Sequence, residues 1–293
     1  MEEENTRKPR EEQFSVDFMC EMLEVSRSGY YAWIGRGIPD RVTEDQKLTL
    51  LIMRTHHDHD GLYGIDRITA ELANQGYHHS PKRVRRLARA AGLSCKHPRP
   101  YVTTTVQDKA NGQGLVDLVG RSFFPDCPNE LWYGDITYIF TRKGWVYLAT
   151  VIDGFSRRVV GWAVDDNMRD ELTKAALEMA ITNRRPSPGQ VVFHSDRGSQ
   201  YTSSDFRDYC FANGVIPSVG HTGICYDNAA AESWNALYKK ELIYLHIWDD
   251  LEHVRKASFH WIETYYNRKR IQKELGYMNP ARYEEEFDKE RAA

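Results

Sequence analysis

The sequence predicts an α/β protein in which a five-stranded mixed sheet has flanking helices and small all-α units come before it. Three observations support this prediction. Runs rich in β-branched and aromatic residues occupy 131–164, helical and strand-like segments alternate after them, and residues 15–92 carry helical periodicity. The chain has 293 residues, 41% of them hydrophobic, which is enough for one sizeable core and one or two small ones.

Two helical units are expected before the sheet. The segment Ser15 to Trp33 predicts two short helices around a turn, with Ser26 capping the second, as in a helix-turn-helix. A second unit runs from about Asp45 to Gly92. Its last helix has three terminal signals, because Ser80 stands at the cap, Pro81 at the first position and Gly92 just past the end.

The last helix of this second unit also carries most of a basic run. The net charge of the chain is −3, yet residues 82–99 hold seven cations and no acid: Lys82, Arg83, Arg85, Arg86, Arg89, Lys96 and Arg99. In the helix itself Val84, Leu87 and Ala88 share one side and the arginines the other. The pattern fits a helix that packs on one face and binds DNA phosphates with the opposite face, although a solvated helix face would give the same run.

The segments after residue 129 predict the core of the protein. Three antiparallel strands are expected at 131–140, 145–153 and 157–164, then a helix at 171–184, a short strand at 191–196, a helix at 203–214, a strand at 216–219 and a long helix from about Asn228. This β-β-β-α-β-α-β order is that of a ribonuclease-H-like fold.

The chain therefore divides into five expected parts. They are an N-terminal helical region (1–43), a helix-turn-helix domain (44–95), a linker rich in proline, threonine and glycine (96–128), the α/β core (129–245) and a C-terminal helical extension (246–293).

Composition excludes several classes of protein. No run of about eighteen apolar residues exists, and the charged first forty positions do not form a signal peptide, so we expect a cytoplasmic protein with no membrane segment. The five cysteines form no CxxC pair, which argues against a disulfide framework and a zinc knuckle.

Three acidic residues stand where this fold brings chain segments together. Asp135 lies in the first strand, Asp196 closes the fourth, and Glu232 lies one turn into the last helix, 35 residues beyond Asp196. Carboxylates hold the Mg²⁺ ions of phosphodiester exchange, in which two ions activate the attacking oxygen and stabilise the leaving one. We expect Asp135 to be shared between two ions, Asp196 to bind one and Glu232 the other, with Mn²⁺ as a substitute.

Four sequence motifs around these acids occur in order: LWYGDITYI, VIDGFSRRVVGWAV, FHSDRGSQYTS and CYDNAAAESWNALYKKEL. With them the sequence resembles the integrase-type core of bacterial insertion-sequence transposases, specifically the second-frame product of the IS-three family. The resemblance also covers GLYGIDRITAEL, KRVRRLARAAGL and the closing YYNRKRIQKELGYMNPARY. The spacing of the three acids is similar to that of retroviral integrases.

The resemblance implies roles for particular residues. It places the family's catalytic, metal-binding triad on Asp135, Asp196 and Glu232, and it implicates Lys239, two helical turns after Glu232, in holding DNA phosphate. An exposed helix lysine is the alternative for Lys239. The supporting candidates are Asp227 and Asn228, which capping alone would explain, and His194 and Arg197, which flank Asp196 and contact substrate or pack.

Two features depart from the expected pattern. Gly134 stands directly before the first acid, where relatives often have threonine, and we expect it to loosen the strand locally. His56, His57 and His59 are close in sequence, as in a zinc site of the retroviral-integrase type, but no cysteine pair accompanies them. A solvated loop is therefore favoured.

The resemblance implies Mg²⁺-dependent cleavage of element ends and strand transfer on double-stranded DNA by a homo-multimer. It implies that the protein acts alone, with a first-frame DNA-binding partner, or as a fusion to that partner. Two other classes of function remain. One is a DNA-binding regulator with an inactive core, and the other is a ribonuclease-H-type nuclease that hydrolyses strands without joining them.

Overall fold

The computed structural model describes residues 14–36, 39–96, 118–119, 125–220 and 229–292. Asp227, Asn228 and most of the predicted linker lie outside these residues. None of the described helices is both long and apolar enough to cross a membrane.

A mixed five-stranded sheet forms the centre of the core, in the order β3-β2-β1-β4-β5. The first three strands are antiparallel, whereas β4 pairs parallel to both β1 and β5. The strands are β1 (Leu131–Thr141), β2 (Gly144–Asp153), β3 (Val159–Asp165), β4 (Val191–Ser195) and β5 (Val215–Val219). The predicted ribonuclease-H-like fold is confirmed.

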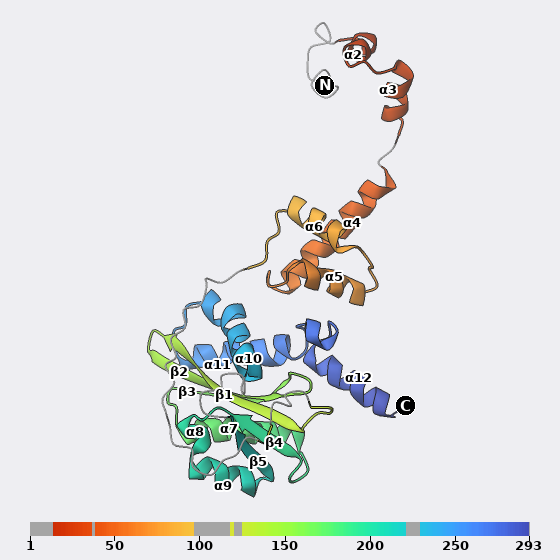
Figure 1. The fold of residues 1–293 in the computed structure, drawn as a ribbon. Helices are drawn as coiled ribbons and strands as arrows, with labels where there is room; N and C mark the ends of the chain where they lie inside the picture. Colours follow the sequence, from red (N-terminus) through yellow and green to blue (C-terminus); the bar gives the residue numbers. More distant parts are fainter. Residues whose placement is uncertain (1–13, 37–38, 97–117, 120–124, 221–228, 293) are drawn as a thin grey trace.

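Helices cover both faces of the sheet (Figure 1). One face packs against α7 (Asp170–Arg184), α8 (Ser199–Thr202) and α9 (Ser204–Ala212). The other face packs against α10 (Ala229–Glu241), α11 (Leu251–Phe259) and the π-helical turn η3 (His260–Tyr266). Alternation along β1 explains this arrangement, because Trp132 belongs to the first cluster and its neighbours Leu131 and Tyr133 to the second.

Gly134 contributes to the packing of the first face. A methyl group on this residue would lie 2.2 Å from Cζ of the Phe193 ring, closer than carbon atoms can approach. Gly134 therefore leaves space for Phe193 within paired strands, and the expectation that it loosens β1 is wrong.

We expect Gly134→Ala to lower the free energy of unfolding by about 1–3 kcal/mol, because the Phe193 ring has to move within a packed cluster. Urea denaturation measures this change. Gly64→Ala is the matched control, since a methyl group there meets no atom within 4 Å, and its effect should be smaller. Equal effects of the two substitutions would contradict this account.

The helical domain before the core consists of α4 (Asp40–Asp58), α5 (Ile65–Asn74) and α6 (Pro81–Ala90). As predicted, the Ser80 hydroxyl caps α6 by accepting a hydrogen bond from the Arg83 amide. Val84, Leu87 and Ala88 are the buried residues of α6. The predicted boundary between residues 43 and 44 falls inside α4, which is one continuous helix.

This helical domain docks on the C-terminal segment. The Tyr63 hydroxyl donates to the Lys269 carbonyl at 3.3 Å and accepts from the Ile271 amide at 2.9 Å. The Asn74 amide donates to the Tyr277 carbonyl near the short helix η4 (Lys273–Leu275). The buried apolar residues of both parts form one continuous cluster.

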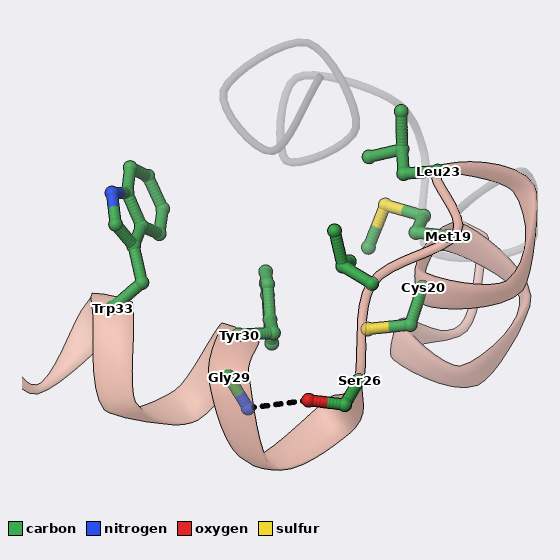
Figure 2. Close-up of a pocket in the computed structure, with 8 residues that line it drawn as sticks. Met19, Cys20, Leu23, Ser26, Gly29, Tyr30 and Trp33 are labelled. Atoms are coloured by element: carbon green, nitrogen blue, oxygen red, sulfur yellow. Dashed lines mark hydrogen bonds between the residues drawn. The ribbon is translucent and has the colours of Figure 1, made fainter.

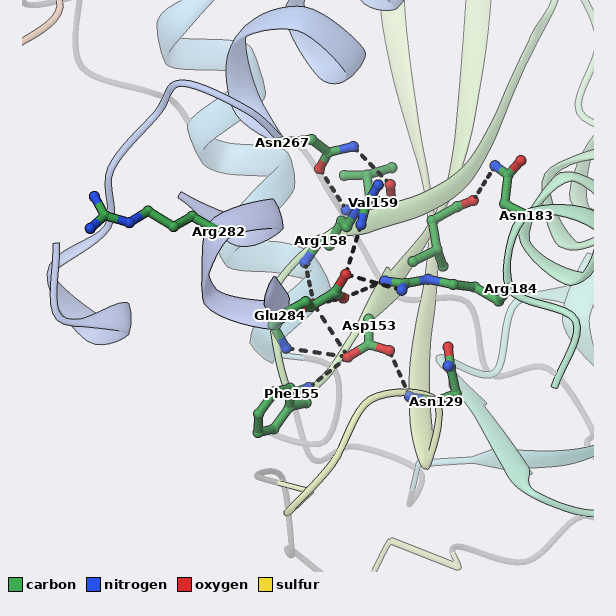
Figure 3. Close-up of polar contacts among 12 residues, drawn as sticks. Asn129, Asp153, Phe155, Arg158, Val159, Asn183, Arg184, Asn267, Arg282 and Glu284 are labelled. Carbon is green, nitrogen blue, oxygen red and sulfur yellow. Dashed lines mark hydrogen bonds and ion pairs between the residues drawn. The ribbon is translucent and has the colours of Figure 1, made fainter. Parts of the chain in front are cut away.

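The C-terminal helix α12 (Pro280–Ala292) is held against the core by one buried carboxylate (Figure 3). Glu284 accepts hydrogen bonds from Ser156 at 2.6 Å and Arg158 at 2.7 Å, and it also pairs with Arg184 of α7. These contacts hold the pKa of Glu284 below its usual range even though burial raises it.

Two short helices, α2 (Val16–Met22) and α3 (Arg27–Ile34), precede α4. Ser26 caps α3 as predicted, by accepting from the Gly29 amide. An apolar hollow of about 630 Å³ lies between them. Figure 2 shows Met19, Tyr30 and Trp33 among its lining residues. The short helix η2 (Ile243–Leu245) follows α10 in the core.

Candidate active site

Asp135 and Asp196 lie next to each other at the point where the pairing of β1 with β4 ends. The parallel pairs between these strands run from Leu131 and Val192 to Gly134 and Ser195. The residue after each member of this last pair is an aspartate, Asp135 on β1 and Asp196 after β4. The two aspartates therefore lie side by side at the carboxyl end of β4. Ligand sites in α/β sheets gather at such an edge, next to the carboxyl ends of the strands.

The helix α10 brings Glu232 to the same edge. Asn235 follows Glu232 by three positions, which puts both on one face of α10. The Asn235 amide donates to Oδ2 of Asp135 at 2.7 Å. This hydrogen bond ties the face that carries Glu232 to β1. Glu232 and Asp196 have exposed side chains, whereas Asp135 is half-buried.

The local electrostatics disfavour negative charge on all three acids. Burial, followed by the charge of Asp196, raises the pKa of Asp135 to about 7, against smaller opposing effects of Asn235 and the Ile136 amide. Surrounding protein atoms raise the pKa of Asp196 and Glu232 too, and the Asp196 charge adds to the effect on Glu232. The Gly198 amide donates to Asp196 at 2.9 Å, which partly offsets the rise in the pKa of Asp196.

The residues present suit a divalent cation. Asp135 accepts two hydrogen bonds, from Asn235 and the Ile136 amide, and neither Asp135 nor Asp196 pairs with a cationic side chain in the described part of the chain. Oxygen donors with uncompensated charge are what Mg²⁺ prefers. As they stand, however, the described residues contain no group of three acids, histidines or cysteines close enough together to hold an ion.

The supporting candidates His194 and Arg197, and the DNA-binding candidate Lys239, each contact a neighbouring part of the core. His194 is fully buried in β4, and its Nδ1 lies 3.0 Å from the Ser218 hydroxyl on β5. Arg197 donates from Nε to the Gly220 carbonyl at 2.7 Å, which joins the ends of β4 and β5. Lys239 stands two turns after Glu232, with Nζ 4.9 Å from the centroid of the Tyr138 ring.

Asn235 is a site residue that we did not predict from sequence. The signal for it was weak, since it consists of one amide three positions after Glu232, and asparagine on a helix has many other roles. The hydrogen bond to Asp135 becomes visible only once α10 is packed on β1.

The five basic candidates on α6 fall into two groups. Arg83 and Arg86 pair with Asp45 near the start of α4, and Arg83 also pairs with Glu44. These ion pairs hold α6 against α4. Lys82, Arg85 and Arg89 are exposed and make no ion pair with a described residue. The surface they form is the free basic face of α6.

The expected solvated loop at His56, His57 and His59 is wrong. His56 and His57 lie in the last turn of α4, and His59 is 7% exposed with its ring stacked on Tyr63 at a centroid distance of 3.7 Å. Burial lowers the pKa of His59 to about 4, so the ring is neutral and part of the domain interface.

Comparisons with known proteins identify the family. A model described as an HTH-like domain matches residues 43–101, and two models described as Integrase core domain match residues 125–225 and 213–280. The transposase InsF of insertion sequence IS3A from Escherichia coli K12 is 36% identical over 275 residues, which cover 93% of this chain and 94% of that protein. The chain belongs to the IS3-family transposases.

A second relative agrees with this IS3-family assignment. An uncharacterized 31 kDa protein of insertion element IS600 from Shigella sonnei is 36% identical over 92% of this chain and 98% of its own length. Among solved structures, the integrase catalytic core of HTLV-2, in complex with magnesium, matches 54% of this chain and 98% of that chain at 19% identity and a TM-score of 0.40. As an IS3-family member with an integrase core, the chain is a DNA transposase, a polynucleotidyl transferase.

Proposed function

We propose that Asp135, Asp196 and Glu232 are the catalytic residues of this transposase and that they hold two divalent metal ions, Mg²⁺ or Mn²⁺. The register of β1 and β4 carries this proposal, because it puts Asp135 and Asp196 side by side at the edge that α10 crosses. When bound, the ions would activate the attacking oxygen and stabilise the leaving oxygen of the phosphodiester.

The protein residues around the acids have their own tasks. Asn235 orients the Asp135 carboxylate before a substrate binds, by donating to its Oδ2. In this proposal Asp135 would help to hold both ions, Asp196 one of them and Glu232 the other. The exposed positions of Asp196 and Glu232 leave the site open to DNA. Water would attack the phosphodiester at one element end and break its P–O3′ bond, which frees the 3′-hydroxyl. That hydroxyl would then attack a second phosphodiester and displace its 3′-oxygen.

An assay of joining separates this proposal from the two alternatives. With labelled element-end DNA and Mg²⁺, a transposase gives both cleaved and joined products. Cleavage without joined products would instead identify a nuclease of the ribonuclease-H type. Binding without either product, at any Mg²⁺ or Mn²⁺ concentration, would identify a regulator with an inactive core.

The parts outside the core have proposed roles as well. The helix-turn-helix domain binds element ends. The protein acts as a homo-multimer, either alone or with a first-frame DNA-binding protein. It works at the nucleoid in the cytoplasm. Apart from the boundary that falls inside α4, the five-part division of the chain remains our proposal for its domain organisation. The free basic face of α6 supports the role of the helix-turn-helix domain, since Lys82, Arg85 and Arg89 have no competing partner among the described residues.

We expect alanine at Lys82, Arg85 or Arg89 to weaken DNA binding and to reduce the slope of log affinity against log salt by about 0.9 for each lost phosphate contact. Arg83→Ala is the matched control, because Asp45 and Glu44 already hold its guanidinium. Its main effect should be on the stability of the helical domain. Fluorescence anisotropy at several salt concentrations measures the slopes, and an equal loss for Arg83→Ala would contradict the assignment.

A further inference from the structure

Three aromatic side chains line one face of the β1–β2 hairpin near its turn. Phe140 is 65% exposed and Trp145, directly opposite in the ladder, is 51% exposed. Their ring centroids are 5.1 Å apart, and Trp145 also meets Tyr138 edge-to-face at 5.8 Å. We call Tyr138, Phe140 and Trp145 the aromatic strip. Exposed rings gathered in one place mark a binding surface more often than single exposed residues do.

The strip begins next to the candidate active site. Tyr138 follows Asp135 by three residues, about 10 Å along β1, and its side chain leaves the strand on the opposite face. The helix α10 spans the same distance, because its Asn235 contacts Asp135 and its Lys239 lies over the Tyr138 ring. Because β4 pairs with β1 only as far as Gly134, a ligand that leaves the carboxylates past Lys239 passes round this edge of β1 to the Tyr138 ring.

The hairpin turn is held in place, so the rings are presented in a fixed arrangement. The Thr141 hydroxyl donates to the Gly144 carbonyl at 2.8 Å, and the Arg142 amide donates to the carbonyl of buried Trp248 at 2.9 Å. The side chains of the two turn residues are also paired, Arg142 with Asp249 and Lys143 with Asp250. A surface fixed before binding loses less entropy when a ligand arrives.

The chemistry of the strip suits unpaired nucleotides. Every base has a π-face that stacks on exposed aromatic rings whatever its sequence, while a nearby cation attracts the backbone. Lys239 supplies that cation, and the acids closest to the turn, Asp249 and Asp250, are already paired. The strip contains only three rings, which is small for a stable protein interface.

We propose that the aromatic strip, together with Lys239, binds unpaired DNA bases beside the active site. Because this inference rests on the proposed function, it concerns the DNA that the enzyme cleaves and joins. Stacking would favour DNA ends whose terminal bases are unpaired over fully paired ends, at about tenfold higher affinity for one stacked base.

The test compares two DNA probes on the full-length protein without divalent metal. One is a blunt element-end duplex, and the other is the same duplex with a short single-stranded extension that carries 2-aminopurine. The wild-type protein should bind the extended probe about tenfold more tightly and quench its fluorescence by stacking. The double variant Phe140→Leu with Trp145→Leu, which keeps apolar bulk without rings, should lose both effects and bind the blunt duplex as the wild type does.

Phe211→Ala is the matched control, since Phe211 is 61% exposed on α9, in another part of the structure. It should leave the preference for the extended probe unchanged. Equal affinity of the wild-type protein for both probes, with no quenching, would overturn the proposal. So would a double variant that keeps the preference but forms smaller oligomers in light scattering, since the strip would then be a protein interface. Failure of the proposed function is distinct, because it shows as no cleavage or joining of the blunt duplex with Mg²⁺.

Discussion

Asp135→Asn should abolish both cleavage and joining, by at least about a thousandfold, while binding of element-end DNA stays within about threefold of the wild type. The substitution keeps the shape and the hydrogen-bonding size of the side chain but removes the charge that two metal ions would share. Charge stabilisation by bound metal contributes several kcal/mol to phosphoryl chemistry, which corresponds to a loss of this size. Gel assays of product formation and fluorescence anisotropy of binding measure the two effects.

In the absence of metal and above pH 7, Asp135→Asn should have a higher free energy of unfolding than the wild type. The folded-state pKa of Asp135 is raised to about 7, so the folded protein holds this proton more tightly than the unfolded chain does. Stability is therefore lost as pH rises from about 4 to about 7, by an amount on the order of 2–4 kcal/mol. Asp135→Asn removes this loss. Thermal unfolding at pH 5 and pH 8, with a chelator present, measures the difference between the two proteins.

Asp208→Asn is the control for both experiments, because Asp208 is exposed on α9. It should retain activity and follow the pH dependence of the wild type. Two results would contradict the assignment of Asp135: an Asp135→Asn protein that still joins DNA, or one whose stability falls with pH as steeply as that of the wild type.

Arg270→Ala should lower the free energy of unfolding by about 3–5 kcal/mol, the cost of leaving a buried charge without its partner. The Arg270 side chain is almost fully buried, and two of its nitrogens donate to the two Glu241 oxygens at 2.8 Å. Glu241 ends α10, and Arg67 of α5 reaches it at 3.7 Å. The ion pair therefore joins α10, the C-terminal segment and the helix-turn-helix domain.

Chemical denaturation measures this loss, and Lys289→Ala provides the comparison. Lys289 pairs with Glu286 on the exposed side of α12, where an ion pair contributes at most about 1 kcal/mol. We also expect Arg270→Ala to impair joining more than binding of short DNA, because the helical domain loses its fixed position on α10. Similar losses of stability for the two variants would contradict the role of the buried pair.

Much of the fold followed from local patterns in the sequence. Alternating apolar residues predicted the strands, and cap residues such as Ser26 and Ser80 predicted where helices begin. These signals work because they depend on neighbours within a few residues. The three acids were predicted from this pattern together with the resemblance of the surrounding motifs to the transposase family.

Long-range contacts could not be predicted in the same way. The space that Phe193 requires above Gly134 depends on two strands almost 60 residues apart in sequence. The pairing of Arg83 with Asp45 spans 38 residues, and only the packed domain shows that it occupies part of the basic face. His59 looked like a surface residue until the docking of Tyr63 on the C-terminal segment was known.

The central claim is that Asp135, Asp196 and Glu232 hold divalent metal together. Crystals of the full-length protein with element-end DNA and Mn²⁺, measured at the manganese absorption edge, test it most directly. We predict anomalous density with oxygen ligands from all three side chains and the DNA phosphate. Manganese bound elsewhere, or held by the two aspartates with Glu232 directed away from it, would contradict the claim.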